Sequence, residues 1–409
     1  MCKIALVDDL LEFGKLVLFV SGALTVAIAV RGVAGRLAIP TAGALLVAAA
    51  AASDLFDRLS TVLSFEDVQR VATLALIVIL FEGGSKIGPR RFREAAVPIV
   101  ALGVLGTFGT AALIAVAAHV ALDLSWTVSG LIGAALAPTD PAVTFSVLAG
   151  KEVSGRSGTI LEGESGFNDP VGIALMVGMV ELATQDDGSF STVVGEFAVE
   201  MTIGLAIGIA GALALGAVSR YDVLPDRSLY PIAVILAAGA IYGTAAVAHG
   251  SGFLAVFVAG ILVGDVEFRA RADVRSFNAA LSDLGELAAF VALGLTVDLT
   301  LIADEGLWWR GLLLAVLLGF VIRPLVVGPL LAAVRLTWGE RGFIVWSGLK
   351  GAVPILLASL AVVGGTDYAP ELYGIVFVVV LFSVVVQGTL VPTVAARLGV
   401  PMETIERDQ

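Results

Sequence analysis

The sequence comprises 409 residues, of which 58% are hydrophobic and 15% are charged, and its formal net charge is −12. Ordinary soluble domains carry about 25% charged residues, so this composition excludes a soluble fold. An acidic chain also lacks the basic surface that nucleic-acid binding requires, and the single cysteine, Cys2, excludes a disulfide framework within the chain.

Apolar runs of about 20 residues recur along the chain, and each is long enough to cross a hydrocarbon core about 30 Å thick. We therefore predict an all-α polytopic membrane protein with about thirteen transmembrane helices, in a single integral membrane domain over residues 1–409. The predicted spans are centred near residues 25, 45, 78, 106, 138, 170, 206, 239, 259, 290, 321, 352 and 382. Twelve spans is the alternative, because the second and ninth runs are short.

Lysine and arginine gather in alternate loops. Seventeen lie in the odd-numbered loops and the C-terminal tail, five lie on the opposite side, and two, Arg323 and Lys350, fall inside spans. Because cytoplasmic loops carry the excess of basic residues, we place the N-terminus outside and the C-terminus in the cytoplasm. The tail after Arg397 has twelve residues, so we expect no soluble regulatory domain.

Several ionisable side chains fall within or beside the predicted spans. A charge at the centre of a transmembrane helix costs roughly 2.5–3.5 kcal/mol, so each of them is a candidate functional residue. They are Glu82, Asp140, Glu162, Glu164, Asp169, Arg323 and Lys350. Glu82 lies towards the cytoplasmic end of the third span, where it is either a site ligand or an interfacial acid whose charge reaches the headgroups.

The fifth span contains two prolines, Pro138 and Pro141, which must interrupt the helix. Irregular backbone at membrane depth persists only where protein buries it or where it lines a water-filled cavity. Free carbonyl groups near Thr139 and the carboxylate of Asp140 would supply the oxygen ligands that a small hard cation prefers. The alternative is a structural proline kink with a hydrogen-bonded aspartate.

The sixth span opens with the acid-rich segment 162–170. Ser165 shares a helical face with Asp169, four residues later, and Glu164 lies less directly beneath it. A hydroxyl and a carboxylate therefore point the same way, next to a proline that loosens the backbone. The alternative for Asn168 and Asp169 is an N-terminal helix cap at the membrane surface.

The twelfth span is interrupted by glycine and proline in the segment 348–354, which contains Lys350. Two broken helices in opposite halves of the chain indicate a transporter site at the interface of two repeats. The fifth and twelfth spans run in opposite directions, as inverted repeats with crossed discontinuous helices require. Asp140 would compensate the positive half-helix ends, and Lys350 would compensate the negative ones.

Arg323 lies in the middle of the eleventh span, directly before a proline. Its guanidinium stays protonated in proteins and needs an anionic partner or water. We expect this partner to be Glu164, with Glu162 as the second choice, and we expect the pair to hold the sixth and eleventh helices together.

Four segments, at residues 81–84, 137–141, 162–170 and 348–354, resemble the signature segments of NhaP-type sodium/proton antiporters. This group belongs to the monovalent cation:proton antiporter superfamily, in the branch shared with eukaryotic sodium/proton exchangers. The resemblance covers nearly the whole chain. It implies a homodimer with core-type helices at about residues 70–185 and 280–397 and interface-type helices at about residues 16–53 and 193–264.

The resemblance also implies roles for individual residues. Asp169 would bind the cation and the proton alternately, and the pair Asn168–Asp169 resembles the electroneutral branch. Asp140, the carbonyl group of Thr139 and Ser165 would complete the site for transported Na⁺, with Glu82 as a further candidate.

Two further roles follow from the same resemblance. Glu164 and Arg323 would form a structural ion pair. Lys350 departs from the arginine that the family usually carries, and this leaves its role open, because lysine is a point charge without the guanidinium fork.

We predict a transporter and not an enzyme: a secondary active exchanger of a monovalent cation for H⁺ by alternating access, electroneutral at 1:1. Na⁺ is the first choice of cation, Li⁺ and K⁺ are the alternatives, and no cofactor is expected. The expected location is the plasma membrane.

A rival hypothesis is an intramembrane aspartyl protease that uses Asp140 and Asp169 as a catalytic dyad. Such proteases resemble one another in a Gly-x-Gly-Asp segment, and the nearest stretch here, at residues 262–265, lacks the first glycine. A passive channel is the third hypothesis.

Overall fold

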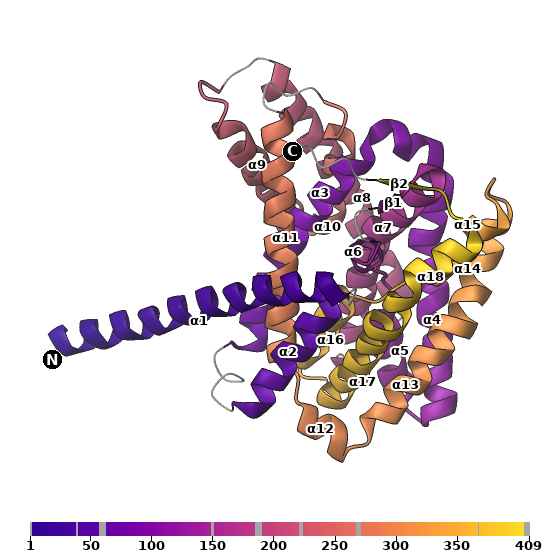
Figure 1. Ribbon diagram of the computed structural model, residues 1–409, viewed down its shortest axis with the longest axis horizontal. Helices are drawn as coiled ribbons and strands as arrows, with labels where there is room; N and C mark the ends of the chain where they lie inside the picture. Colours follow the sequence, from indigo (N-terminus) through magenta and orange to yellow (C-terminus); the bar gives the residue numbers. More distant parts are fainter. Residues whose placement is uncertain are drawn as a thin grey trace.

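The computed structural model describes residues 2–37, 40–56, 63–148, 151–184, 190–220, 224–266, 271–366 and 368–404. Within these residues the regular structure is a helical bundle (Figure 1) with two short antiparallel strands, β1 (Lys151–Val153) and β2 (Met402–Thr404). The expectation of an all-α fold is therefore right apart from this small sheet. Three of the arginines counted for the orientation, Arg58, Arg269 and Arg407, lie outside the described residues.

The helices up to residue 184 begin with α1, which projects away from the bundle (Figure 1). They are α1 (Cys2–Leu37), α2 (Thr41–Leu55), α3 (Phe65–Val100), the π-helical stretch η1 (Ala101–Gly106), α4 (Thr107–Leu122), α5 (Trp126–Leu136), α6 (Pro141–Ser146) and α7 (Gly155–Thr184). A capping box between Ser64 and Asp67 fixes the start of α3.

The continuous run from Phe65 to Leu122 has 58 residues and is about 87 Å long at 1.5 Å per residue, more than twice the hydrocarbon thickness. It bends at Gly88, whose φ of 67° favours glycine. This bend separates the predicted third span from the fourth.

The second half of the chain continues with helices that are interrupted in several places by π-helical stretches or breaks. They are α8 (Phe190–Arg220), α9 (Leu229–Val247), α10 (Gly252–Val263), α11 (Arg271–Leu295), α12 (Leu299–Asp304), α13 (Leu307–Leu317), η2 (Leu318–Ile322), α14 (Arg323–Ala332), α15 (Trp338–Trp346), α16 (Ala352–Val363), α17 (Ala369–Phe382), η3 (Ser383–Gly388) and α18 (Thr389–Leu398).

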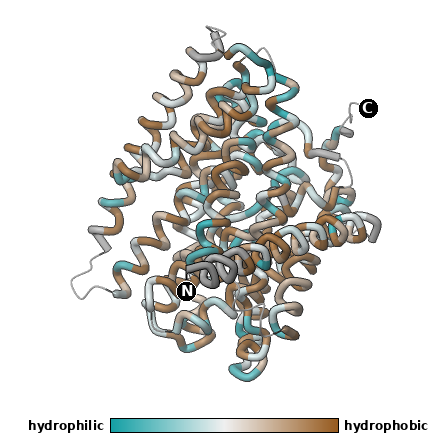
Figure 2. Tube along the Cα trace, turned by 90° about the vertical axis from the view of Figure 1, so that its left-hand side faces the viewer, coloured by the Kyte–Doolittle hydropathy of each residue, from teal (hydrophilic) through white to brown (hydrophobic). Residues whose placement is uncertain are grey.

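Most helical turns are hydrophobic, with hydrophilic residues at intervals between them (Figure 2). Eight helical stretches of the described chain are long and apolar enough to cross a membrane, and four shorter apolar helices accompany them. Every predicted span centre falls within a helix or directly beside one. The chain is therefore a multi-pass membrane protein, whereas the number of thirteen crossings stays a prediction.

Small residues let some of these helices pack closely. Gly84 of α3 faces the backbone of α10, and Gly260 of α10 faces the backbone of α3 at Phe81. Such contacts are typical of membrane helices, which gain stability from close packing because lipid is as apolar as the side chains. The helices α5 and α16 pack against α7, and the candidate site lies around α7 and the helix breaks next to α5 and α16.

Candidate functional site

Two interrupted helices meet in the interior of the bundle. The first break separates α5 from α6 at residues 137–140, and the second separates α15 from α16 at residues 347–351. The backbone N–H of Asp140 donates a hydrogen bond of 2.8 Å to the carbonyl of Leu349, and the hydroxyl of Thr144 donates one of 3.3 Å to the carbonyl of Ser347. The two discontinuous helices predicted from proline and glycine are thus confirmed, and their unwound segments lie side by side.

Lys350 lies at this meeting point and is 1% exposed. Its ammonium group donates hydrogen bonds to the carbonyl oxygens of Ala137, at 2.9 Å, and of Pro138, at 2.7 Å. These carbonyls follow directly on α5, where the last turn of a helix leaves acceptors without partners and carries a partial negative charge. The ammonium group of Lys350 therefore lies against the carbonyl end of α5, and its charge-compensating role stays a prediction.

Helix α7 contacts the first break through two polar side chains. The amide nitrogen of Asn168 donates to the hydroxyl of Thr139 at 2.8 Å, and the amide oxygen of Asn168 accepts from the backbone N–H of Thr139 at 3.3 Å. The hydroxyl of Ser165 donates to the carbonyl of Thr139 at 2.7 Å. Asn168 and Ser165 thereby hold the unwound backbone of Thr139 against α7. Asn168 and Asp169 are buried within α7, so neither is a helix cap at the surface.

Asp169 is 5% exposed, and its Oδ1 atom has no hydrogen-bond partner among the described residues. Buried polar atoms are nearly always hydrogen-bonded, because leaving one unpaired costs about 1–3 kcal/mol. An unpaired carboxylate oxygen in this position is therefore a group that gains from binding a proton or a cation. Of the predicted site residues, Asp140, Ser165 and Glu82 line the same cavity as Asp169.

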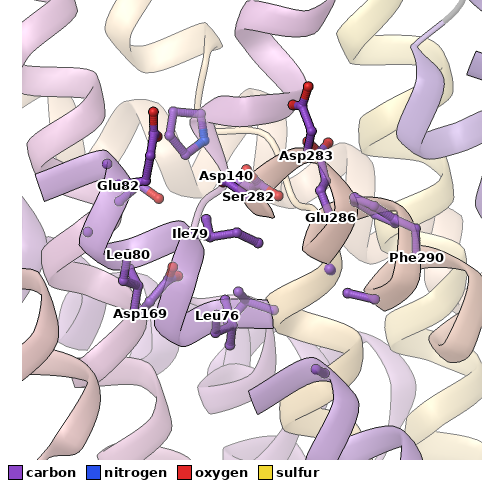
Figure 3. A pocket seen from close by; sticks show the side chains of 18 of the residues that line it. Leu76, Ile79, Leu80, Glu82, Asp140, Asp169, Ser282, Asp283, Glu286 and Phe290 are labelled. Atoms are coloured by element: carbon purple, nitrogen blue, oxygen red, sulfur yellow. The ribbon is translucent and has the colours of Figure 1, made fainter. Parts of the chain in front are cut away.

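This cavity has a volume of about 390 Å³. Among the described residues, six acidic side chains line it, against two basic ones, Arg31 and Lys86. Figure 3 shows Glu82 and Asp169 towards one side, Asp283 and Glu286 of α11 towards the other, and Asp140 and Ser282 between them. The acidic residues are Glu82, Asp140, Glu162, Asp169, Asp283 and Glu286. A cleft lined by one sign of charge concentrates ions of the opposite sign, so this cavity attracts cations.

Sequence reasoning missed Asp283 and Glu286. They lie three residues apart on α11, and this spacing puts them on one helical face. That spacing, at the beginning of a predicted span, is the signal that could have found them. Asp283 also forms an ion pair with Arg31 of α1, with 3.1 Å between Asp283 Oδ2 and Arg31 Nη2, so the charge of Asp283 is partly compensated.

Glu82 lies in the cavity wall, and its side chain is 9% exposed. The ammonium group of Lys86, one helical turn further along α3, lies 2.9 Å from its Oε1 atom. The structure therefore brings Glu82 to the cavity that Asp169 and Asp140 share, while its ion-pair partner lies on its own helix.

Arg323 and Glu164 form a buried ion pair. The distance between Arg323 Nη1 and Glu164 Oε1 is 2.6 Å, and the two side chains are 5% and 2% exposed. Arg323 Nη2 also donates to the carbonyl of Ile344 at 3.4 Å. The pair thereby connects α7, α14 and α15 beside the crossing. Glu162, the second choice of partner, lines the cavity instead.

Comparisons with known proteins relate the chain to one family. The family model described as "Sodium/hydrogen exchanger, transmembrane" matches residues 20–397. The chain is 32% identical over 392 residues to the K(+)/H(+) antiporter NhaP2 of Shewanella sp. (strain ANA-3), and the match covers 93% of this chain and 67% of the relative. It is 28% identical over 352 residues to the Na(+)/H(+) antiporter ApNhaP of Aphanothece halophytica, covering 80% of this chain and 64% of the relative.

A solved structure has the same fold. The sodium proton antiporter MjNhaP1 from Methanocaldococcus jannaschii superposes with a TM-score of 0.78 at 22% identity, over 93% of this chain and 99% of the other. The chain spans about two thirds of the length of the NhaP2 relatives. Taken with the crossed broken helices and the acidic cavity, the match over residues 20–397 shows that this chain belongs to the transmembrane sodium/hydrogen exchanger family.

Proposed function

We propose that this chain is a secondary active transporter that exchanges a monovalent cation for H⁺ by alternating access, in an electroneutral 1:1 ratio. Na⁺ is our first choice of cation. K⁺ is the second, because relatives named as K⁺/H⁺ and as Na⁺/H⁺ antiporters both match, and Li⁺ is a further candidate. One observation carries the proposal: the buried carboxylate of Asp169, with an oxygen unpaired among the described residues, faces an acidic cavity beside unwound backbone.

The mechanism follows from the cost of moving a charge through the membrane. A carboxylate without a bound ion is negative, and a charge at bilayer depth costs roughly 2.5–3.5 kcal/mol on insertion scales. Binding of either H⁺ or a monovalent cation neutralises Asp169. If the two compete for the same oxygen atoms, only the loaded site crosses readily, and each cation that moves one way requires a proton that moves the other way.

The cation ligands that we propose are oxygen atoms of Asp169, Asp140, Ser165 and the carbonyl of Thr139, with Glu82 as a further candidate. Ser165 already donates to the Thr139 carbonyl, but a hydroxyl oxygen and a carbonyl oxygen each keep a lone pair for a cation. Asn168 positions this group through its two bonds to Thr139.

We further propose that the cavity opens to the cytoplasm, so that the described conformation faces inward. Arg31 and Lys86 line the cavity with exposed side chains, and both belong to the basic loops that the charge asymmetry assigns to the cytoplasm. The same asymmetry supports an external N-terminus and a cytoplasmic C-terminus, and we propose the plasma membrane as the location. The homodimer and the division into core-type and interface-type helices complete the proposal.

The decisive experiment is cation-driven proton exchange in proteoliposomes, followed with a pH-sensitive dye. Asp169→Asn keeps the volume of the side chain and removes the titratable oxygen, so we expect exchange to fall to the level of empty vesicles. Asp304→Asn, at an exposed position at the end of α12, is the matched control and should exchange like the wild type. Retained exchange in Asp169→Asn would refute the assignment.

A further inference from the structure

We propose that Ser383 and Gln387 are positioning residues for the cation site, because they anchor the second helix break and thereby aim Lys350 at the end of α5. The inference rests on the proposed exchange function and names side chains through which the site is held. Neither residue contacts the cavity. Both belong to η3, the π-helical stretch of the last helix, at a position that sequence analysis left without a role.

The two side chains form a chain of hydrogen bonds along the break. The amide nitrogen of Gln387 donates to the carbonyl of Trp346 at 2.7 Å. The hydroxyl of Ser383 donates to the amide oxygen of Gln387 at 3.3 Å and accepts from the backbone N–H of Lys350 at 2.8 Å. The chain therefore runs from the last residue of α15 to the backbone of Lys350.

These bonds satisfy groups that the break exposes. The carbonyl of Trp346 and the N–H of Lys350 lie at the broken ends of α15 and α16, where backbone groups lose their partners within the helix. An unpaired backbone group at membrane depth costs several kcal/mol. Ser383 is 3% exposed and Gln387 is 8% exposed. Water therefore has little access to this position and could not easily replace their hydrogen bonds to the backbone.

The π-helical turn explains how one helix supplies both groups. Ser383 and Gln387 are four residues apart and share a helical face, and a π-helical stretch widens the turn locally, as often happens at functional sites. The π-helical stretch lies between the α-helices α17 and α18, and both residues that contact the break lie within it.

Anchoring the backbone of Lys350 matters because its side chain reaches in the other direction. Its ammonium group is bound to Ala137 and Pro138, and a lysine side chain is a flexible stem that does not fix its own direction. The residue before it, Leu349, accepts the hydrogen bond from the N–H of Asp140. A shift of residues 349–350 therefore moves a proposed cation ligand and the charge that neutralises α5.

The test compares Ser383→Ala and Gln387→Met with the wild type, with Ser383→Thr as the variant that keeps the hydroxyl. Thr389→Val is the matched control, because the Thr389 hydroxyl donates only to Val385 of its own helix at an exposed position. In proteoliposomes we expect the apparent KM for Na⁺ to rise roughly five- to tenfold in the first two variants. The apparent KM should return close to the wild-type value in Ser383→Thr, and the double variant should be less than additive, since both side chains act through one chain of bonds.

Hydrogen–deuterium exchange of the peptide over residues 347–353, measured on the full-length protein, decides the positioning role independently of transport. We expect this peptide to take up deuterium faster in Ser383→Ala and Gln387→Met than in the wild type, and at the wild-type rate in Thr389→Val. An inactive wild type would refute the exchange function alone. Unchanged deuterium uptake by this peptide in the two variants would overturn the positioning role. It would also be overturned if the wild type transports and the variants change only the maximal rate of transport or the melting temperature.

Discussion

At the scale of single residues, the buried charges are arranged so that each has a defined electrostatic role. The ammonium group of Lys350 lies against the carbonyl end of α5, and Arg323 is matched by Glu164 at 2.6 Å. Glu164 Oε2 and Arg323 Nε, like Asp169 Oδ1, lack a hydrogen-bond partner within the described residues. Asp169 differs from the other two because, among these residues, it forms no ion pair. The charges that hold the helices are thus compensated by protein groups, whereas the proposed exchange group would be neutralised by its ligand.

The buried ion pair gives a stability prediction. Arg323→Met should destabilise the fold by about 3–5 kcal/mol, because it leaves the Glu164 carboxylate buried without its partner. Combining it with Glu164→Gln should recover part of the loss. Thermal or denaturant unfolding in detergent would measure both. Arg70→Met is the control, since its pairs with Glu66 and Asp67 are exposed to solvent and contribute little to stability.

Equal stability of Arg323→Met and Arg70→Met would contradict this account of the pair. A double variant that is less stable than Arg323→Met would contradict it as well. Neutralising Glu164 would then not relieve the cost of a buried unpaired charge, which the account assigns to the Arg323→Met variant.

At the scale of elements, the crossing of the broken helices depends on the absence of side chains at close contacts. A Cβ atom at Gly351 would overlap the carboxylate of Asp140. Gly351→Ala should therefore displace Asp140 and lower cation-driven exchange by roughly tenfold or more, as misplacing a site group by about 1 Å can cost about a hundredfold.

The matched control for Gly351→Ala is Gly239→Ala on α9, where a Cβ atom would meet nothing within 4 Å. Alanine is also the better helix former by about 1 kcal/mol, so this variant should exchange normally and unfold no earlier than the wild type. Exchange rates in proteoliposomes, normalised to incorporated protein, make the comparison. Normal exchange by Gly351→Ala would show that the contact with Asp140 is not required.

The elements also show how far sequence reasoning reaches. Both breaks were predictable, because Pro138, Pro141 and the glycines around Lys350 disrupt helical hydrogen bonding in a local and well-understood way. The partner of Arg323 was predictable because few acids lie at membrane depth. The π-helical stretches η1, η2 and η3, the short helix α12 and the pairing of β1 with β2 were not, since they depend on tertiary contacts between distant segments.

For the same reason the cavity was predicted only in part. Asp140, Asp169, Ser165 and Glu82 carry recognisable local patterns, whereas Asp283 and Glu286 reach the cavity only through the packing of α11 against α3. Ser383 and Gln387 lie in an apolar run and have no local signal at all.

At the scale of the whole molecule, the acidic cavity is accompanied by a second hollow, for which the predicted topology gives the opposite direction of access. The second hollow, of about 580 Å³, is lined by Ser53, Asp54 and Thr300, among others. The predicted topology assigns the first to the cytoplasm and the second to the outside. Thr296 and Phe65, which line the second hollow, contact Tyr373 through a hydrogen bond and an edge-on ring contact respectively.

Cysteine labelling in a Cys2→Ser background tests this topology. Ser146→Cys lines the acidic cavity and Thr300→Cys lines the second hollow, and both positions are exposed. A membrane-impermeant thiol reagent should label Ser146→Cys only from the cytoplasmic side of oriented vesicles and Thr300→Cys only from the outside. Labelling of both from one side would overturn the assigned topology.

The central claim is that Asp169 cannot hold H⁺ and the transported cation together, and calorimetric titration of the purified protein with Na⁺ tests it most directly. Repeating the titration in buffers of different ionisation enthalpy counts the protons released. We predict about one proton released per cation at low pH and an apparent affinity that falls up to about tenfold for each unit that the pH is lowered, with neither effect in Asp169→Asn. Cation binding without proton release, at an affinity independent of pH, would contradict the account.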